Sequence, residues 1–124
     1  HEEKFLPKLF MCYKEKLAFP LYGDGLQRRE WIWVEDNIRI IDLLTHSSNH
    51  YGIYNVGTGD IWCNLDIISD VTEITQGEIN FQEVEDRLGH DRMYWLDCGK
   101  LDRELGYYPT MDLEKYLEDT FQWV

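Results

Sequence analysis

Basic side chains that could bind an anion gather in two segments of this chain. Arg29 lies beside two tryptophans in a segment of alternating side chains, and Arg87 and His90 lie within residues 86–92, around a glycine. A guanidinium presents a fork of N–H donors to phosphate oxygens, and each charge-assisted hydrogen bond contributes roughly 1.5–3 kcal/mol. Together with the neighbouring indoles, these groups predict a site for an anionic, ring-containing ligand.

Both segments also allow a purely structural interpretation. Arg29 suits the surface of an ordinary half-buried strand, and residues 86–92 suit a charged loop held by internal Asp–Arg pairs. Arg28 could be a second phosphate contact or a surface charge, and we favour the surface. A phosphate next to His90 would stabilise the protonated imidazole.

A turn and a strand must position Arg29. Gly23-Asp24-Gly25 tolerates positive φ, so the backbone can reverse tightly between two extended segments. Strand side chains alternate, so Arg29 shares one face with the indoles. The opposite face, which includes Ile32 and Val34, is apolar enough to enter the core.

Hydrophobic residues at helical spacing predict five helices joined by short strands. The first, over residues 3–18, has Leu9 and Leu17 on its apolar face and Pro7 near its start. The second, over residues 34–47, should pack on the sheet through Ile38, Ile40, Ile41, Leu43 and Leu44. The other helices are expected at 65–76, 100–106 and 112–123, and strands at 19–22, 51–57, 79–84 and 93–97. The helix at 100–106 should end at a Gly106 C-cap, and the last helix should direct inward Leu113, Tyr116, Leu117, Thr120 and Phe121. This alternation predicts an α/β fold of irregular topology, with residues 1–124 as one domain.

Acidic and histidine side chains on the second helix have two possible roles. Glu35 and Asp36 fall in its first turn, where negative charge complements the helix dipole, although an acid–base pair is an alternative. Asp42, His46 and His50 recur every four residues and could present metal ligands on one face, but the residues that follow His46 are typical of a helix end. We favour the structural role for both sets.

The run Gly57-Thr58-Gly59 invites comparison with a dinucleotide-binding fingerprint, but it lacks the required context. No third glycine follows at the required spacing, and no strand–helix–strand unit precedes the run. Asn64, at the start of the next helix, suits either an N-cap or an anion contact. The sequence therefore predicts no NAD site in this chain.

The composition limits the partners of the chain. Its 124 residues include 24 acidic and 12 basic side chains, a net charge of −12, which disfavours nucleic acid and anionic membranes. Cys12, Cys63 and Cys98 have neither metal-like nor paired spacing, which indicates reduced thiols. No apolar run approaches the roughly 20 residues of a membrane helix, and no signal peptide is visible. We therefore expect a cytoplasmic location. The first residue is His, so the sequence leaves open whether the chain is processed, a fragment or the product of an incomplete gene.

Six motifs follow one another in a recognisable order. The central one runs from Gly23 to Asp36 and reads Gly-Asp-Gly-Leu-Gln-Arg-Arg-Glu-Trp-Ile-Trp-Val-Glu-Asp. The others are Glu3-Lys4-Phe5-Leu6-Pro7, Tyr54-Asn55-Val56-Gly57, Asn64-Leu65-Asp66, Asp86-Arg87-Leu88-Gly89-His90-Asp91-Arg92 and Arg103-Glu104-Leu105-Gly106. This order resembles the sugar-nucleotide-binding part of extended short-chain dehydrogenases/reductases, and most closely the dTDP-glucose 4,6-dehydratases.

The resemblance implies a small, irregular α/β substrate-binding domain without the Rossmann half. It implies that Lys4, Leu6 and Pro7 surround the nucleotide base and its sugar, and that Leu21 and Tyr22 line the base pocket. It also implies that the diphosphate is bound by Arg29, Asn64, Arg87 and His90. Two departures put local contacts in doubt: Leu88 replaces a usual proline, and residues 61–63 replace a stretch that often carries Ser or Lys.

A complete member of this family needs residues that this chain lacks. These are a glycine-rich turn for NAD, a Tyr followed four residues later by Lys, and an Asp-Glu pair beside it. None of the eight tyrosines has Lys at that position. The resemblance therefore implies a chain that is inactive alone and holds a dTDP-sugar or another NDP-sugar for a Rossmann-fold N-terminal half, in cis or as a separate chain. Residues 86–92 favour a dehydratase over a related epimerase or decarboxylase, and the alternative is a non-catalytic binding module or a truncated remnant.

Overall fold

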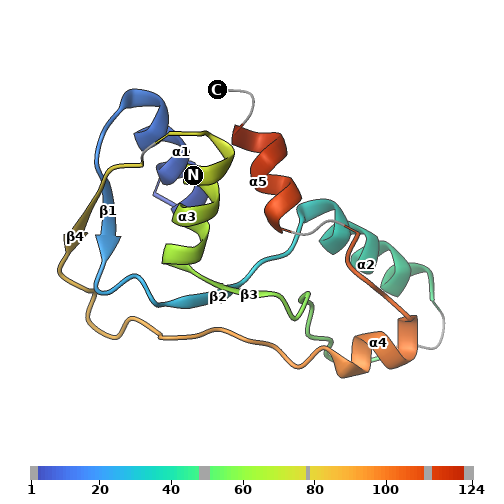
Figure 1. Cartoon of the computed structure of the whole chain (residues 1–124). Coiled ribbons are helices and arrows are strands. Elements are labelled where there is room, and N and C mark those ends of the chain that lie inside the picture. The colour runs from blue at the N-terminus through green and yellow to red at the C-terminus, as the bar shows by residue number, and fades with distance from the viewer. Residues whose placement is uncertain (1–2, 48–50, 78, 111–112, 122–124) are drawn as a thin grey trace.

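The computed structural model describes residues 3–47, 51–77, 79–110 and 113–121, and combines helices with short strands (Figure 1). In chain order its elements are α1 (Phe5–Glu15), β1 (Phe19–Tyr22), β2 (Arg28–Glu30), α2 (Val34–His46), β3 (Ile61–Cys63), α3 (Asn64–Ile74), β4 (Phe81–Val84), α4 (Gly99–Leu105) and α5 (Leu113–Phe121). The predicted helices are all present, with ends that differ by a few residues. None of the described helices is long and apolar enough to cross a membrane.

The strands form two separate pairs. β1 and β4 are parallel, with Phe19 opposite Phe81, whereas β2 and β3 are antiparallel, with Arg29 opposite Trp62. The Gly23–Gly25 turn has the expected positive φ, 60° at Gly23 and 69° at Gly25. It does not make a hairpin, because the strands on its two sides belong to different sheets.

Two predicted strands are absent. Residues 51–57 form no strand. Two of their polar groups instead bond to residues 97–100: the carbonyl of Tyr51 accepts from Lys100 Nζ at 3.0 Å, and Asn55 Nδ2 donates to the carbonyl of Asp97 at 3.0 Å. Of residues 93–97, only Met93 forms a bridge, with Arg28. The predictions of a strand in these two segments were therefore wrong.

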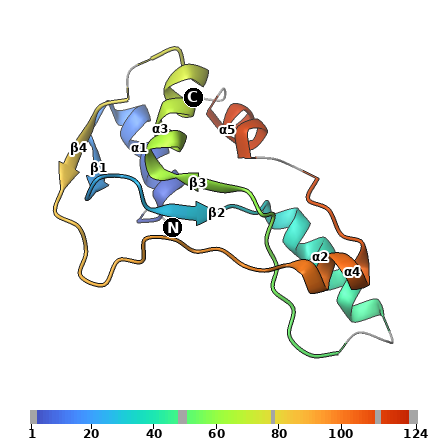
Figure 2. The same ribbon diagram turned by 60° about the horizontal axis from the view of Figure 1, so that its bottom comes forward.

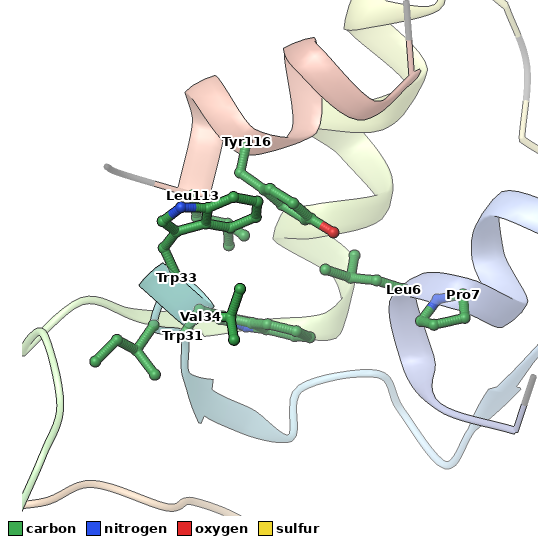
Figure 3. A pocket seen from close by; sticks show the side chains of 8 residues that line it. Leu6, Pro7, Trp31, Trp33, Val34, Leu113 and Tyr116 are labelled. Atoms are coloured by element: carbon green, nitrogen blue, oxygen red, sulfur yellow. The ribbon is translucent and has the colours of Figure 1, made fainter. Parts of the chain in front are cut away.

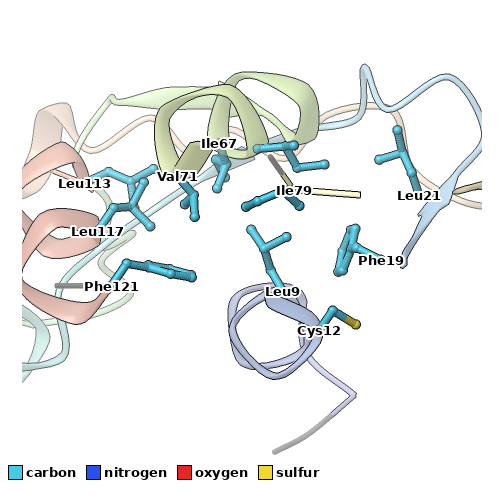
Figure 4. Close-up of a cluster of buried hydrophobic side chains, with 11 residues drawn as sticks. Leu9, Cys12, Phe19, Leu21, Ile67, Val71, Ile79, Leu113, Leu117 and Phe121 are labelled. Atoms are coloured by element: carbon cyan, nitrogen blue, oxygen red, sulfur yellow. The ribbon is translucent and has the colours of Figure 1, made fainter. Parts of the chain in front are cut away.

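The hydrophobic core lies between α1, α3, α5 and β1 (Figure 4). Leu9 of α1, Val71 of α3 and Leu117 of α5 are completely buried, and Phe10 stacks edge-on against Phe121 at 5.6 Å between ring centroids. The inward positions predicted for α5 are confirmed. Leu17 is not part of this core: α1 ends before it, at Lys16, whose φ of 57° is left-handed, and Leu17 is 55% exposed.

Helix α2 lies apart from this core, near α4 (Figure 2). Only Ile40 of its apolar residues is fully buried, so the predicted packing of the whole helix on the sheet is wrong. Val34, Ile38 and Ile41, each more than half exposed, recur at the spacing of one helix face and are called the α2 stripe below. The prediction failed because helical periodicity identifies an apolar face but not its partner.

The face assignment around Arg29 also needs correction. Val34 is 58% exposed, whereas Trp31, predicted to lie on the opposite face, packs against the core and lies 6.3 Å from Phe5 between ring centroids. β2 ends at Glu30, and α2 begins at Val34. The strand alternation therefore does not continue far enough to set the orientation of Val34.

Helix α3 begins with a capping box formed by Cys63 and Asp66, and not with Asn64 as N-cap. Asp66 N donates to Cys63 Sγ at 3.4 Å, and Cys63 N donates to Asp66 Oδ2 at 3.0 Å. Hydrogen bonds from the Cys63 side chain and the Cys63 backbone N–H to the carboxylate lower the pKa of Asp66 below its usual value, whereas burial raises the pKa of the Cys63 thiol. All three cysteines are free thiols.

Helix α4 ends at Gly106, which has a left-handed φ of 58°, as predicted.

Candidate functional site

A cavity of about 650 Å³ brings together most of the predicted phosphate ligands. Arg29 comes from β2, Asn64 is the first residue of α3, and Arg87 and His90 come from the loop after β4. Tyr22 at the end of β1 completes this group of five predicted site residues. We call this cavity the basic cavity. Its other lining residues are Glu3, Phe5, Lys8, Phe19, Pro20, Glu30 and Trp31.

The guanidinium of Arg29 is held in place by three contacts. Nη1 donates to the carbonyl of Arg28 at 2.7 Å, and Nη2 donates to the carbonyl of Asp91 at 3.0 Å. Its central carbon also lies 4.4 Å from the centroid of the Tyr94 ring, within the range of a cation–π contact. A guanidinium has more N–H donors than these two carbonyls accept, so Arg29 retains donors for an anion.

Arg87 and Tyr22 form a second cation–π pair at the cavity. The guanidinium carbon lies 5.3 Å from the centroid of the Tyr22 ring, which is 40% exposed. A flat ring and a guanidinium side by side offer both a surface for an aromatic base and donors for a phosphate.

The His90 side chain is 8% exposed and forms a close pair with Asp86, since its Nδ1 lies 2.6 Å from Asp86 Oδ1. The same carboxylate accepts hydrogen bonds from the backbone N–H of Arg87 and from Gln27 Nε2, each at 2.9 Å. These contacts, the one with His90 first, lower the pKa of Asp86. Asp86 is therefore a carboxylate at neutral pH, at the back of a basic site.

The first turn of α3 offers the cavity a side chain rather than free amides. The backbone N–H of Asn64 donates to the carbonyl of Gln27 at 3.2 Å, and that of Leu65 donates to the carbonyl of Gly25 at 3.1 Å. The third amide is used in the capping box described above. Asn64 itself lines the cavity, so an anion contact would be made by its carboxamide.

Four predicted site residues do not line the basic cavity. Leu21 is 1% exposed and belongs to the core, and Lys4 is an exposed residue just before α1. Leu6 and Pro7 line a neighbouring apolar pocket of about 290 Å³, between the start of α1, the start of α2 and α5 (Figure 3). Trp31 lines both hollows and forms a common wall between them.

Sequence reasoning did not select Phe5 and Lys8, which line the basic cavity from α1. Their spacing of three residues puts them on one helix face, and this was the available signal. Glu30 was assigned only to a strand face. The structure places its carboxylate against the backbone of Gly57 and Gly59, where its Oε1 accepts the Gly59 N–H at 2.5 Å.

The Glu30 carboxylate also bears on NAD binding. A Cβ atom added at Gly57 would lie within 2.7 Å of both Glu30 oxygens, so the carboxylate fills the space beside this glycine. A pyrophosphate would be repelled there. Gly57-Thr58-Gly59 therefore does not fit the pyrophosphate of a dinucleotide.

No metal site is evident in the described parts of the chain, which contain no cluster of three His, Cys, Asp or Glu side chains suited to a metal. His46 and Asp42 do face each other, 3.2 Å apart across one turn of α2. The third residue of the metal hypothesis, His50, lies outside the described residues.

Comparison with known proteins identifies the family. The sequence pattern of the family described as GDP-mannose 4,6 dehydratase matches residues 2–120. The chain belongs to this family. Its curated relatives include the dTDP-glucose 4,6-dehydratase of Streptomyces griseus, 36% identical over 98% of this chain, and a low-salt glycan biosynthesis protein of Haloferax volcanii, 37% identical over 95%. The chain spans 37% and 38% of the lengths of these two relatives.

Solved structures of dehydratases and epimerases have the same arrangement of elements. The DesIV dTDP-glucose 4,6-dehydratase of Streptomyces venezuelae, with NAD and TYD bound, has a TM-score of 0.90 and 34% identity, and the match covers 99% of this chain and 38% of that one. A UDP-glucuronic acid 4-epimerase of Bacillus cereus, with UDP-glucuronic acid and NAD, has a TM-score of 0.91 and 25% identity, and covers 99% and 40%. The resemblance to extended short-chain dehydrogenases/reductases is confirmed, and the coverage is consistent with their C-terminal part.

Proposed function

We propose that this chain is the nucleoside-diphosphate-binding part of a dTDP-glucose 4,6-dehydratase-like enzyme. The observation that carries the proposal is the basic cavity, which gathers two arginines, a histidine and an asparagine from three segments in a chain of net charge −12. Such a concentration of donors overcomes locally the repulsion that the overall charge exerts on an anion.

Each lining residue has a role in this proposal. Arg29 and Arg87 bind the diphosphate through their free N–H donors, and His90 and Asn64 add single hydrogen bonds. The ring of Tyr22 supports the base. Leu6 and Pro7 close the nucleotide site on the side of the apolar pocket, next to Trp31. Lys4 covers the edge of the nucleotide site at the start of α1. Leu21 acts from the core as the support of Tyr22, its neighbour in β1.

The chemistry in this proposal takes place on another segment. The chain has no Tyr followed four residues later by Lys. The space beside Gly57, in the Gly57-Thr58-Gly59 run, is filled by the Glu30 carboxylate. A Rossmann-fold half, in cis or as a separate chain, supplies NAD and the catalytic groups, and this chain is inactive alone. Binding of the remote nucleotide positions the hexose for oxidation at C4 and loss of water across C5 and C6.

The α2 stripe provides a contact surface for that half. Its three aliphatic side chains, Val34, Ile38 and Ile41, are 58%, 57% and 53% exposed. Contiguous exposed apolar side chains mark interaction surfaces. The relatives are more than twice as long as this chain, so their remaining part is the natural occupant. The cytoplasmic location and the single domain over residues 1–124 stay predictions.

Calorimetric titration of the folded chain with dTDP, UDP and NAD tests the proposal. We expect binding of dTDP, weaker binding of UDP and no binding of NAD. NAD binding, or binding of dTDP that is unchanged when Arg29 and Arg87 are both replaced by alanine, would contradict it. Absence of all nucleotide binding by a folded chain would show that the basic cavity is not a preformed nucleotide site.

A further inference from the structure

A hydrogen-bonded chain behind the basic cavity connects a buried glutamine to His90. Gln27 is 1% exposed and its Nε2 donates to Asp86 Oδ2 at 2.9 Å. The other oxygen, Asp86 Oδ1, lies 2.6 Å from His90 Nδ1. Burying a carboxamide costs free energy unless it is hydrogen-bonded, so the position of Gln27 depends on this carboxylate.

The turn before Gln27 is packed directly against the same pair. A Cβ atom added at Gly23 would lie 2.9 Å from Asp86 Oδ2 and 3.1 Å from Gln27 Nε2. Gly23 also has a φ of +60°, and its N–H donates to the carbonyl of Val84 at 3.0 Å. Both the conformation and the close approach favour glycine here. The turn therefore leaves room for the carboxylate and fixes its position.

A backbone turn over residues 87–90 holds His90 in place. The His90 N–H donates to the carbonyl of Arg87 at 3.1 Å, which closes a turn in the loop, and the side chain is 8% exposed. With Nδ1 facing Asp86, the nitrogen left for a ligand in the cavity is Nε2. Which nitrogen of a histidine carries its proton is set by the hydrogen bond that the other nitrogen makes.

We propose that Asp86, held by Gln27, is a positioning residue that fixes His90 with Nδ1–H directed at the carboxylate and Nε2 directed at a phosphate oxygen of the bound nucleotide. In the occupied site the ring lies between the Asp86 carboxylate and the phosphate as an imidazolium, so that Nε2–H donates to the phosphate. The proton that this form needs is taken up from solvent on binding. This inference rests on the proposed function, in which His90 contacts the diphosphate.

Other charges around the cavity act on the same imidazole. Lys8, Arg29 and Arg87 disfavour the imidazolium, whereas Glu3 and Glu30 favour it. Asp86 differs from these groups because it is in direct hydrogen-bond contact with the ring. A bound phosphate adds negative charge on the opposite side, so His90 would lie between two anionic groups when the site is occupied.

The direct test combines imidazole NMR with binding at several pH values. In the free wild-type chain, long-range ¹⁵N–¹H spectra should show Nδ1 protonated in neutral His90. Asp86→Asn should abolish the preference for this form. For dTDP, we expect affinity to fall about threefold to tenfold at about pH 7.5 and clearly less at about pH 5.5, where a histidine without the carboxylate is also protonated.

Matched variants separate positioning from folding. Asp42→Asn removes the carboxylate of a second histidine–aspartate pair, His46 Nδ1 to Asp42 Oδ1 at 3.2 Å on α2 outside the cavity, and should leave the His90 imidazole signals and dTDP affinity unchanged. Gln27→Leu should weaken dTDP binding about twofold to threefold, with the same pH trend as Asp86→Asn. In a His90→Ala background, Asp86→Asn should produce no further pH-dependent loss.

Two results would overturn the inference. One is a His90 ring protonated at Nε2 in the free chain and unaffected by Asp86→Asn. The other is an Asp86→Asn loss of affinity of equal size at both pH values, which would indicate a structural role only. Failure of the proposed function is distinguishable, because it would appear as absent dTDP binding in a wild-type chain whose NMR spectra still show the Nδ1–H contact.

Discussion

The region around α1, β1, β4, α3 and α5 differs sharply from the region around α2 and α4. The first, called the packed region here, supplies every residue of the main hydrophobic core. The second, the outlying region, contributes only Ile40 and Leu101 as fully buried apolar side chains of its two helices. In both views the two regions lie at opposite sides of the molecule (Figures 1 and 2).

Polar contacts hold the outlying region together. Asp36, fully buried at the start of α2, accepts hydrogen bonds from the backbone N–H and hydroxyl of Thr110, at 3.0 and 2.7 Å. Tyr54 donates to Glu104 of α4, which raises the Tyr54 pKa to about 12. Burial and the neighbouring Asp36 carboxylate raise the Tyr107 pKa to about 12 as well. Apolar burial therefore dominates in the packed region and polar contacts in the outlying region, which leaves the α2 stripe exposed for the partner half proposed above.

Truncating a core leucine should have the largest effect on stability. Leu9→Ala should lower the free energy of unfolding by about 2–5 kcal/mol, because the Leu9 side chain of α1 is completely buried in the hydrophobic core. The matched control is Leu43→Ala in α2, where the side chain is 44% exposed and helix propensity is retained. Urea denaturation of both variants measures the difference. Equal losses would contradict the division into two regions.

Arg29→Ala and Arg87→Ala should each weaken dTDP binding about tenfold or more, which corresponds to about 1.4 kcal/mol. The reason is the loss of a charge-assisted contact in a preformed site at the edge of the packed region. Arg103→Ala, in exposed α4, is the control and should leave affinity unchanged. Calorimetry gives the affinities, and circular dichroism verifies the fold. Unchanged affinity in a folded variant would remove that arginine from the site.

Removing the α3 capping box should cost about 1 kcal/mol. In Asp66→Ala the backbone N–H of Cys63 loses its acceptor. The pKa of Asp66 is lower in the folded chain than its unfolded value of 3.8, so its contribution is present above that pH and is lost as pH falls below it. Denaturation at about pH 7 and about pH 2.5 should therefore show a larger difference from wild type at the higher pH. The control is Asp119→Ala at an exposed position of α5, and a pH-independent loss would argue against the cap.

The smallest effect is expected in the α2 stripe. Ile38→Ser removes an aliphatic side chain that is 57% exposed, so stability should change by no more than about 0.5 kcal/mol. Binding of a fluorescent hydrophobic dye should decrease, because the stripe is shortened. A large loss of stability would show that α2 is packed, and undiminished dye binding would place the exposed apolar surface elsewhere.

Local patterns could be predicted from the sequence, and the pairing of distant segments could not. The periodicity of α1 and α5 and the glycine end of α4 depend on neighbouring residues, and they were predicted. Strand pairing depends on distant segments: residues 51–57 were predicted as a strand, but the carbonyl of Tyr51 accepts from Lys100 and the Asn55 side chain donates to the carbonyl of Asp97. Likewise, the packed face of α2 could not be assigned without its neighbours.

The candidate site shows the same limit. Arg29, Arg87 and His90 were selected by residue type and by the family resemblance, and the structure brings them to one cavity. The positions of Leu6 and Pro7 in the adjoining pocket depend on where α5 and the start of α2 lie. The hydrogen bond between Gln27 and Asp86 joins residues 59 apart in sequence, which no local pattern indicates.

The most direct test of the account is a titration of the ¹⁵N-labelled chain with dTDP, followed by two-dimensional NMR. The account predicts saturable shifts for Arg29, Asn64, Arg87 and His90, with α2 and α4 unchanged, because the nucleotide site is formed without a partner. Shifts concentrated in α2 and α4, or no shifts in a folded chain, would contradict the central claim that the basic cavity is a preformed nucleotide site.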